Sequence, residues 1–153
     1  MKIQTQEMDQ WCWAAVSVSV DKFFNPASSA TQCKVAQDVL SRSCCGGEVA
    51  CNQAAELQTA LDKVNRLRKI VTRRLRFKEI ENELDAFKPV CARIGWDGGG
   101  GHFVVVDKCM ELNSGELLVH VLDPLFPNST IYYDELVSEY LGDGQWTDTF
   151  LVK

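Results

Sequence analysis

The chain has 153 residues, of which 46% are hydrophobic and 24% are charged, and its formal net charge is −5. This length and apolar content fit one domain with a core of its own, which we expect to span residues 1–153. The net negative charge argues against nucleic acid as a partner. No apolar run approaches the roughly eighteen residues that a membrane-spanning helix needs, so the sequence predicts no membrane partner either.

The first part of the chain predicts three helices. Residues 13–24 are mostly small or apolar and stop at Asn25-Pro26, where proline prevents the helix from continuing. Residues 31–41 form the second expected helix, and Asn52 is expected to cap the third. The candidate caps of the second helix are Ser28, Ser29 and Thr31, and the apolar face of the third consists of Ala55, Leu57, Ala60, Leu61 and Val64.

The remainder of the chain predicts mainly strands. Expected strands cover residues 69–77, 90–96, 102–110, 117–122, 130–133 and 147–152, and expected short helices cover 78–87 and 134–140. Asn113-Ser114-Gly115 is typical of a hairpin turn, so the strands on either side of it run antiparallel. Helices followed by antiparallel strands indicate the α+β class, with a helical lobe of about residues 1–64 packed on a sheet lobe of about residues 65–153.

Cys12 is the candidate nucleophile. It opens the first expected helix, where unpaired amide groups and the helix macrodipole favour an anion. A free thiol has a pKa of about 8.5 and needs such help, or a nearby base, to react at neutral pH. His102 follows four glycines and precedes the apolar run 103–106, so we interpret it as a base at the end of a buried strand. Gly100 and Gly101 leave the backbone open to a substrate strand.

Asp123 is the candidate partner that orients His102. The two residues leave and enter the same expected hairpin, so an antiparallel return brings them to one end of the sheet. The simplest register misses direct opposition by about three residues, so a bulge or a diagonal contact is needed. Asp107 competes for this role, but it lies on the strand of His102 and points to the other face. Asp123-Pro124 also fits a simple turn, and His120, in mid-strand, fits a structural residue.

Gln6 is the candidate donor to the negatively charged oxygen that develops during attack, together with the backbone N–H of the nucleophile. Gln4 and Gln10 are the alternatives, and the spacing of six residues before the cysteine favours Gln6. Trp11 and Trp13 flank the cysteine. We expect them to shield it from water and to contact substrate.

Six further cysteines leave several interpretations open. They pair as disulfides, as in an exported protein, or they stay as buried thiols. A zinc site is only weakly indicated, because no histidine lies near residues 33–51 and no spaced Cys-x-x-Cys pair is present. We therefore predict no metal and no cofactor. The six residues are Cys33, Cys44, Cys45, Cys51, Cys91 and Cys109.

Residues 66–78 hold seven of the sixteen basic residues of the chain. The simpler interpretation is the solvated face of an edge strand, and the other is a docking patch for an acidic protein partner. The basic residues are Arg66, Arg68, Lys69, Arg73, Arg74, Arg76 and Lys78.

The site candidates resemble those of the papain-like cysteine peptidases. The shared elements are a glutamine six residues before the cysteine, Cys-Trp, Gly-His followed by an apolar strand, and a third polar residue. The resemblance is closer to the compact bacterial branch, which includes effector proteases that plant-pathogenic bacteria inject into host cells and papain-fold toxins aimed at rival bacteria. The matching segments are Cys12-Trp13-Ala14-Ala15, Cys44-Cys45, Cys51-Asn52, Gly98–Val105 and Asp123-Pro124.

Two departures separate the chain from plant papains. Asp9-Gln10-Trp11 replaces the upstream Cys-Gly-Ser, so the first disulfide of those enzymes cannot form. The third residue is Asp123 in place of asparagine, and the spacing from cysteine to histidine is shorter than the roughly 130–150 residues usual there. The resemblance therefore implies a trimmed papain core.

The resemblance implies a thiol endopeptidase that cleaves proteins through an acyl-enzyme on Cys12, with His102, Asp123 and Gln6 in the roles given above. It also implies a secreted or delivered bacterial effector or toxin, cytoplasmic in the producer before export, although no signal peptide is visible. The expected partners are a protein or peptide substrate and an immunity or inhibitor protein. The alternatives are a deamidase or acyltransferase using the same acyl-enzyme, and a non-catalytic peptide-binding module.

Overall fold

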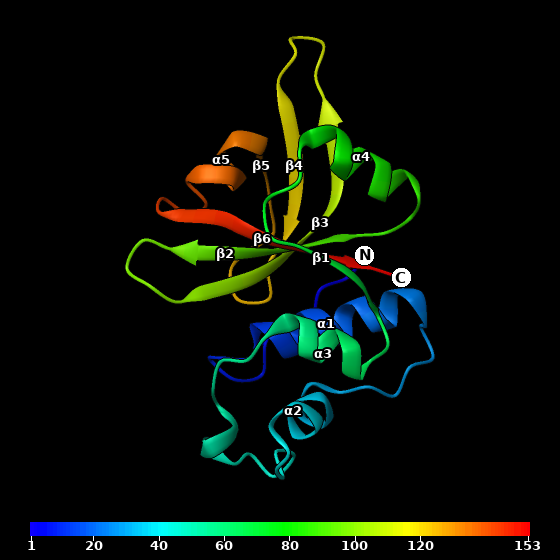
Figure 1. Cartoon of the computed structure of the whole chain (residues 1–153), viewed down its shortest axis with the longest axis vertical. Helices are drawn as coiled ribbons and strands as arrows, with labels where there is room; N and C mark the ends of the chain where they lie inside the picture. Colours follow the sequence, from blue (N-terminus) through cyan, green and yellow to red (C-terminus); the bar gives the residue numbers. More distant parts are fainter.

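Three helices precede all six strands along the chain, and the computed structural model describes all residues 1–153 (Figure 1). The helical elements of the first part are α1 (Cys12–Phe24), α2 (Gln32–Leu40), the short 3-10 helix η1 (Val49–Cys51) and α3 (Leu57–Lys63). The remaining elements are β1 (Leu67–Val71), α4 (Phe77–Asp85), β2 (Val90–Trp96), β3 (Gly101–Glu111), β4 (Leu117–Leu122), β5 (Ser129–Tyr132), α5 (Tyr133–Ser138) and β6 (Gly144–Val152). The predicted mixture of helices and antiparallel strands is confirmed.

The six strands form one antiparallel sheet in the order β1-β6-β2-β3-β4-β5. The predicted hairpin of β3 and β4 is present, with Glu111 opposite Leu117 next to its turn. The last strand, β6, lies between β1 and β2, so the end of the chain is built into the middle of the sheet. The edges are therefore β1 and β5.

Helices cover both faces of the sheet (Figure 1). α1, α2 and α3 form one apolar core with one face, and α4 and α5 form a second core with the other. Alternate residues of β3 enter different cores: Phe103 and Val105 join the first, and Val104 and Val106 join the second. Because both faces are buried here, residues 103–106 are apolar without interruption. No helix of the structure has the length and apolar character to cross a bilayer.

Two predicted details differ from the structure. Asn52 does not cap α3, which begins at Leu57; instead, its side-chain oxygen accepts the backbone N–H of Gln10 at 2.9 Å. The expected strand 69–77 ends at Val71, because Phe77 begins α4 and packs in the second core. In contrast, Thr31 caps α2 as predicted, by accepting the N–H of Lys34.

Four of the six additional cysteines form two disulfides, Cys33–Cys45 and Cys44–Cys51. Both lie in the helical part of the chain, where they fix the loop between α2 and α3. Cys91 and Cys109 are free. Complete burial in the sheet raises the pKa of Cys91 to about 12, which makes it an inert thiol. No group of three or more potential ligand side chains is arranged to hold a metal ion.

The basic segment 66–78 forms the exposed edge strand β1 and the loop that follows it. Residues 68–70 are exposed, in agreement with the interpretation as a solvated edge. Several of its cations have acidic partners, including Asp21, which lies 2.8 Å from Arg66. Arg68 pairs with Glu83 and Arg73 pairs with Glu79. Charged side chains on an edge strand also protect it from pairing with other chains.

The disulfide Cys44–Cys51 should contribute measurably to stability. Replacing both cysteines by alanine should lower the free energy of unfolding by about 2–3 kcal/mol, because the bridge restricts a loop in the unfolded chain. Urea denaturation of the oxidised protein measures this change. The matched control is Cys109→Ser, which removes a partly buried free thiol and should change stability by about 0.5 kcal/mol or less. Equal stability of the two variants would contradict the prediction.

Candidate active site

His102 and Asp123 form a buried hydrogen-bonded pair where the end of β4 meets the start of β3. The ring nitrogen Nε2 of His102 lies 2.8 Å from Oδ1 of Asp123, and both side chains are buried. The competitor Asp107 is not part of this pair. Its carboxylate binds His120 at 2.7 Å and the terminal ammonium of Met1 at 2.6 Å. His120 thus has the structural role that was predicted for it.

A β-bulge at Asp107 brings the pair together. Near the turn of the hairpin, Lys108 lies opposite His120, and an unchanged register would place Asp123 opposite Val105. His102 is three residues from that position and would then point to the other face. The register shifts at Asp107, so that Val105 lies opposite Leu122 and Asp123 follows. His102 and Asp123 are then diagonal neighbours on one face, which combines the bulge and the diagonal contact that were expected as alternatives.

Asp123 has hydrogen-bond donors on both carboxylate oxygens. Oδ1 also accepts the backbone N–H groups of Leu125 and Phe126, at 2.8 and 2.9 Å, and Oδ2 accepts the hydroxyl of Tyr140 at 2.7 Å. The backbone N–H of Asp123 donates to Asn128 Oδ1 at 3.0 Å. The carboxylate therefore binds both the turn after Pro124 and the histidine. The two interpretations of Asp123, as a turn former and as a partner of His102, are compatible in the structure.

Cys12 is the first residue of α1, and its side chain is almost completely buried. The amides of the first helical turn have no carbonyl partner within the helix, so they favour negative charge at this position. Cys12 lies close enough to His102 for its side chain to help raise the pKa of the imidazole. Because Nε2 of that ring is bound to Asp123, Nδ1 is the nitrogen available to the sulfur. The structure thus brings Cys12, His102 and Asp123 into one row.

The charges of this row shift two pKa values in opposite directions. Burial alone would lower the pKa of His102, but hydrogen bonds and charge interactions with Asp123 and Cys12 outweigh it and raise the pKa to about 9. Burial alone would raise the pKa of Asp123, but His102 and the amides of Phe126 and Leu125 outweigh it and lower the pKa. The site therefore favours an imidazolium next to a carboxylate at neutral pH.

The segment before Cys12 is fixed by a series of hydrogen bonds. The backbone N–H of Gln6 donates to the carbonyl of Pro124 at 2.8 Å, which connects this segment to the turn beyond Asp123. Gln32, a buried residue of α2, accepts the N–H of Glu7 and donates to the carbonyl of Thr5 at 2.8 Å. The start of α1 is therefore held against the β4–β5 connection.

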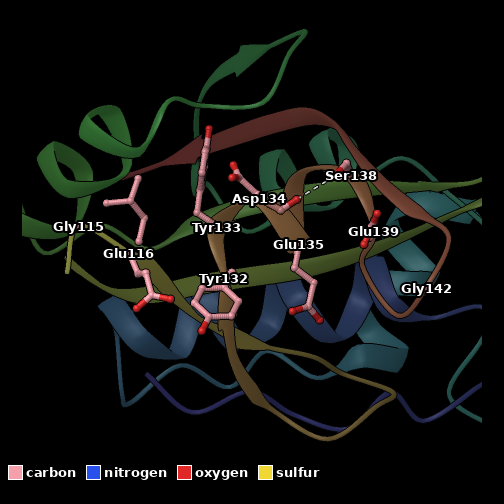
Figure 2. Close-up of a pocket in the computed structure, with 10 residues that line it drawn as sticks. Gly115, Glu116, Tyr132, Tyr133, Asp134, Glu135, Ser138, Glu139 and Gly142 are labelled. Atoms are coloured by element: carbon pink, nitrogen blue, oxygen red, sulfur yellow. Dashed lines mark hydrogen bonds between the residues drawn. The ribbon is translucent and has the colours of Figure 1, made fainter. Parts of the chain in front are cut away.

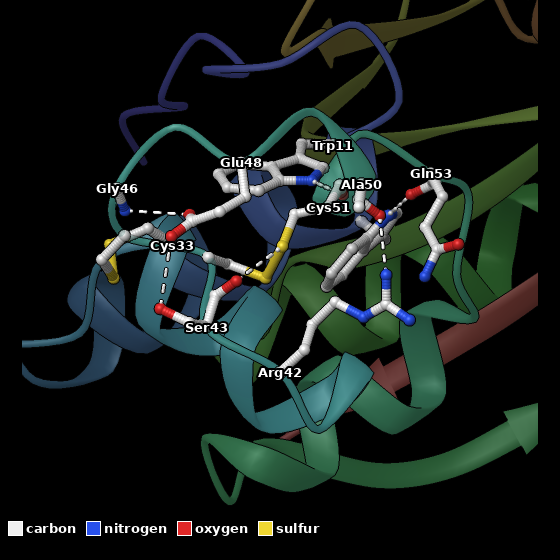
Figure 3. Close-up of a disulfide and its surroundings, with 12 residues drawn as sticks. Trp11, Cys33, Arg42, Ser43, Gly46, Glu48, Ala50, Cys51 and Gln53 are labelled. Carbon is white, nitrogen blue, oxygen red and sulfur yellow. Dashed lines mark hydrogen bonds between the residues drawn. A yellow bond between two sulfur atoms is a disulfide. The ribbon is translucent and has the colours of Figure 1, made fainter.

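Trp11 and Trp13 point into the protein, which contradicts their expected contact with substrate. Their exposed fractions are 1% and 0%. The indole N–H of Trp11 donates to the carbonyl of Cys51 at 2.7 Å, and that of Trp13 donates to the carbonyl of Gln53 at 3.1 Å (Figure 3). Since Cys51 belongs to a disulfide, the two rings connect the segment around Cys12 to a crosslinked loop. Their roles are support and exclusion of water.

The Gln6 side chain faces its own loop. Nε2 donates to the carbonyls of Met8 and Asp9, at 3.0 and 2.6 Å. Its Oε1 is the only buried side-chain nitrogen or oxygen without a hydrogen-bond partner. The bond to Asp9 is exposed, so it is the one that a ligand in the site can replace. Gln6 is thus close to Cys12 in sequence, but its donor groups are occupied.

The glycines before His102 form an exposed turn at the end of the β2–β3 hairpin. Gly100 has a φ of +82°, a conformation that favours glycine. A Cβ atom on Gly101 would lie 2.9 Å from the guanidinium of Arg93 and 3.1 Å from the carbonyl oxygen of Ile94. Gly100 is therefore favoured by its backbone conformation, and at Gly101 a side chain would displace Arg93 and crowd the backbone of β2.

Three aromatic residues of the site had no signal in the sequence. The ring of Trp96 stacks with that of His102, with centroids 6.1 Å apart, and the ring of Phe126 meets the histidine edge-on at 5.9 Å. Tyr140, which binds Asp123, stacks on Trp96 at 6.4 Å. These residues come from β2, the β4–β5 connection and the segment after α5, so no local spacing connects them to the nucleophile.

A hollow of the surface lies elsewhere, between the β3–β4 turn, β5 and α5 (Figure 2). Its volume is about 800 Å³, and it contains neither cysteine nor histidine. Its carboxylates are those of Glu116, Asp134, Glu135 and Glu139. This hollow is thus separate from the site of Cys12, His102 and Asp123.

Comparison with known proteins agrees with this geometry. The sequence model of a family described as papain-like cysteine protease AvrRpt2 matches residues 1–129. The chain belongs to this family. The match includes Cys12, His102 and Asp123, and ends before Tyr140. A search of curated proteins gave no match.

The matching family is a bacterial effector family of papain-like cysteine proteases. It supports cysteine-protease activity, a hydrolytic reaction that acts on protein substrates. The predicted resemblance to a compact bacterial branch of papain-like peptidases is confirmed.

The His102–Asp123 pair predicts a pH-dependent contribution to stability. The pKa of His102 is raised to about 9, so its contribution is fully present below its ordinary pKa of about 6.5 and is lost as the pH rises through about 9. The pKa of Asp123 is lowered, so its contribution is present above its ordinary pKa of about 3.9 and is lost as the pH falls through the folded-state value.

Urea denaturation of the wild type and of His102→Gln across this range measures the contribution. The difference in free energy of unfolding should be largest between about pH 4 and 6.5, should shrink as the pH rises from about 6.5 to about 9, and should be smallest above about pH 9. A difference that is the same at all pH values would contradict the raised pKa of His102.

Proposed function

We propose that the protein is a thiol endopeptidase that cleaves protein substrates with Cys12, His102 and Asp123. One observation carries this proposal: a buried histidine binds a carboxylate through one ring nitrogen, and a cysteine at the start of a helix lies close enough to help raise the pKa of the same ring. This is the arrangement in which a thiol becomes a nucleophile and its proton remains available for the leaving group.

Each residue has one role in the proposed reaction. The thiolate of Cys12 attacks the carbonyl carbon of the peptide and forms a tetrahedral oxyanion. The oxyanion collapses, the C–N bond breaks, and the leaving amine takes the proton from Nδ1 of His102. Water then attacks the thioester and gives a proton to His102, the C–S bond breaks, and the carboxylic acid leaves while the thiolate and the protonated His102 are restored. Asp123 holds the ring in place and stabilises its positive charge.

Two donors are proposed for the oxyanion. The first is the backbone N–H of Cys12, which belongs to the unpaired amides of the first turn of α1. The second is the Nε2 group of Gln6, which would exchange its exposed bond to the carbonyl of Asp9 for the substrate oxygen. This exchange is consistent with the incomplete hydrogen bonding of the side chain, whose Oε1 is buried without a partner.

We propose that the substrate lies between the helical part, about residues 1–64, and the sheet part, about residues 65–153, of one papain-like domain that spans residues 1–153. Gly100 and Gly101 lie beside His102 on the sheet side, where their backbone is exposed to an extended chain. In this position they would bind substrate through backbone groups. Trp11 and Trp13 are left out of this surface because they are buried.

The proposed biological role is that of a bacterial effector or toxin that is secreted or delivered into a target cell. The cytoplasm of the producer would hold it before export, and an immunity or inhibitor protein would restrain it there. The two disulfides fit a protein that spends time outside a reducing cytoplasm. Its proposed partners include neither nucleic acid nor membrane, in line with the net charge of −5.

Labelling by an epoxysuccinyl inhibitor, followed by intact mass and peptide mapping, tests the proposal. One label on Cys12 should form at about pH 5, where an ordinary thiol is almost fully protonated. His102→Ala should lose this labelling, and Cys12→Ala should take no label. Labelling that appears only above about pH 8, and equally in the wild type and His102→Ala, would favour a non-catalytic peptide-binding module.

The products separate hydrolysis of peptides from related reactions. Cleavage should create new N-termini, and its kcat/KM should fall as the pH rises through about 9, because His102 loses the proton that the leaving amine needs. Release of ammonia without new N-termini would indicate a deamidase, and transfer of the acyl group to an added amine would indicate an acyltransferase.

The role of Gln6 can be tested separately. Gln6→Ala should lower kcat by about a hundredfold to a thousandfold, because one of two donors to the oxyanion is lost. Gln10→Ala is the matched control, since that glutamine is exposed and only its backbone is bound, to Asn52. The control should keep wild-type kcat. Equal activity of both variants would remove Gln6 from the oxyanion site.

A further inference from the structure

We infer that Tyr140 is a positioning residue of the active site, which fixes the second carboxylate oxygen of Asp123 with its hydroxyl and supports the ring of His102 through Trp96. This inference rests on the proposed catalytic roles of His102 and Asp123. Tyr140 has an exposed fraction of 1%, so it acts on these groups without touching substrate.

The two oxygens of Asp123 are bound very unequally. Oδ1 accepts three donors, from His102, Leu125 and Phe126. Oδ2 accepts only the hydroxyl of Tyr140, at 2.7 Å in a buried position. The terminal torsion of an aspartate is soft and roughly two-fold, so the carboxylate plane is set by what binds both oxygens. Without Tyr140, one oxygen of a buried anion has no partner, which destabilises the charged form and its orientation.

Tyr140 also contributes to the orientation of the histidine through a stack of three rings. Trp96 is nearly parallel to His102, at an interplanar angle of 21°, and nearly parallel to Tyr140, at 22°. Such packing restricts rotation of the imidazole about its bonds and excludes water from one side of it. Tyr140 therefore supports both members of the pair. Its hydroxyl binds Asp123 directly, and its ring supports His102 through Trp96.

The backbone around Tyr140 is built to hold this position. Its N–H and carbonyl form an isolated bridge with Gly144, with bonds of 2.9 and 2.8 Å. A Cβ atom on Gly144 would lie 2.5 Å from Ile94 and 2.7 Å from Trp96. A side chain at position 144 would not fit, so the glycine allows the bridge between Tyr140 and Gly144 to pack closely against Ile94 and Trp96.

The hydroxyl is required for more than filling space. Phenylalanine would occupy the same volume in the core, so packing alone does not explain a tyrosine there. Burial, followed by the charge of Asp123 and the hydrogen bond to it, raises the pKa of Tyr140. The hydroxyl therefore remains a neutral donor over the whole range in which the enzyme works.

Tyr140→Phe tests the inference, and Tyr133→Phe is its matched control. Tyr133 is also buried, and its hydroxyl donates to the carbonyl of Leu75 at 2.6 Å, in the same core but with no contact to the pair. Both variants remove one buried hydroxyl from the second core. Their thermal unfolding midpoints should therefore fall by similar amounts, and comparison at a temperature where both are folded separates catalysis from stability.

Tyr140→Phe should lower kcat about tenfold with KM unchanged, and Tyr133→Phe should change neither. Loss of the donor raises the pKa of Asp123, so the acidic limb of the kcat/KM profile should move to higher pH only in Tyr140→Phe. The carboxyl carbon resonance of Asp123, titrated by NMR, should show the same upward shift in midpoint. The titration requires no substrate.

The outcomes separate this inference from the proposed function. If the wild type neither cleaves protein nor reacts at Cys12, the proposed function fails, and the Asp123 titration still decides whether Tyr140 sets the charge of the carboxylate. If the wild type is active and both variants have the same kcat, acidic limb and Asp123 midpoint, Tyr140 has only a structural role. A shift confined to Tyr140→Phe supports the inference in either case.

Discussion

A buried carboxylate must be balanced by donors and positive charge, and the region around Asp123 is organised by this requirement. The carboxylate binds His102, Tyr140 and two backbone amides, and the turn that supplies the amides also accepts the N–H of Gln6. The histidine is in turn held charged by the carboxylate and by the sulfur of Cys12. One anion thus connects the hairpin, the segment after α5 and the start of α1, so the site and the packing of the two parts depend on the same interaction.

On the side away from Asp123, hydrogen bonds hold the start of α1 to a loop that a disulfide crosslinks. The carbonyls that bind the indoles of Trp11 and Trp13 belong to the loop of Cys51, which the disulfide to Cys44 closes. Because both rings are buried, Cys12 between them is held in the core rather than on a surface loop. A helix rich in valine has a modest propensity of its own, so burial on most sides, together with these bonds, determines where α1 begins.

Local pattern predicted the strands and the candidates His102 and Asp123, because both follow from a hairpin with a clear turn. It did not predict the bulge at Asp107, since that register shift depends on contacts with distant residues. It misjudged Asn52, a good cap by type, because a backbone group from another segment binds its side chain. Tyr140 was missed for the same reason. Its position depends on the turn before β6, and β6 lies beside β2 only in the folded sheet, so no spacing along the chain indicates this contact.

Buried polar groups of a folded protein are almost always satisfied, and exceptions gather where function requires a group to change partners. In this chain the single exception is Oε1 of Gln6, six residues before the nucleophile, while the Nε2 group of the same amide holds an exposed bond to a carbonyl. Asp123 is the opposite case, because four donors bind its carboxylate and fix its orientation. The contrast follows from what the proposed chemistry needs. The pair of His102 and Asp123 holds a proton and must stay fixed through the reaction cycle. The Gln6 donor is needed only while the negatively charged oxygen exists. An amide whose bond to a carbonyl is exposed to solvent can exchange that bond for one to the oxyanion.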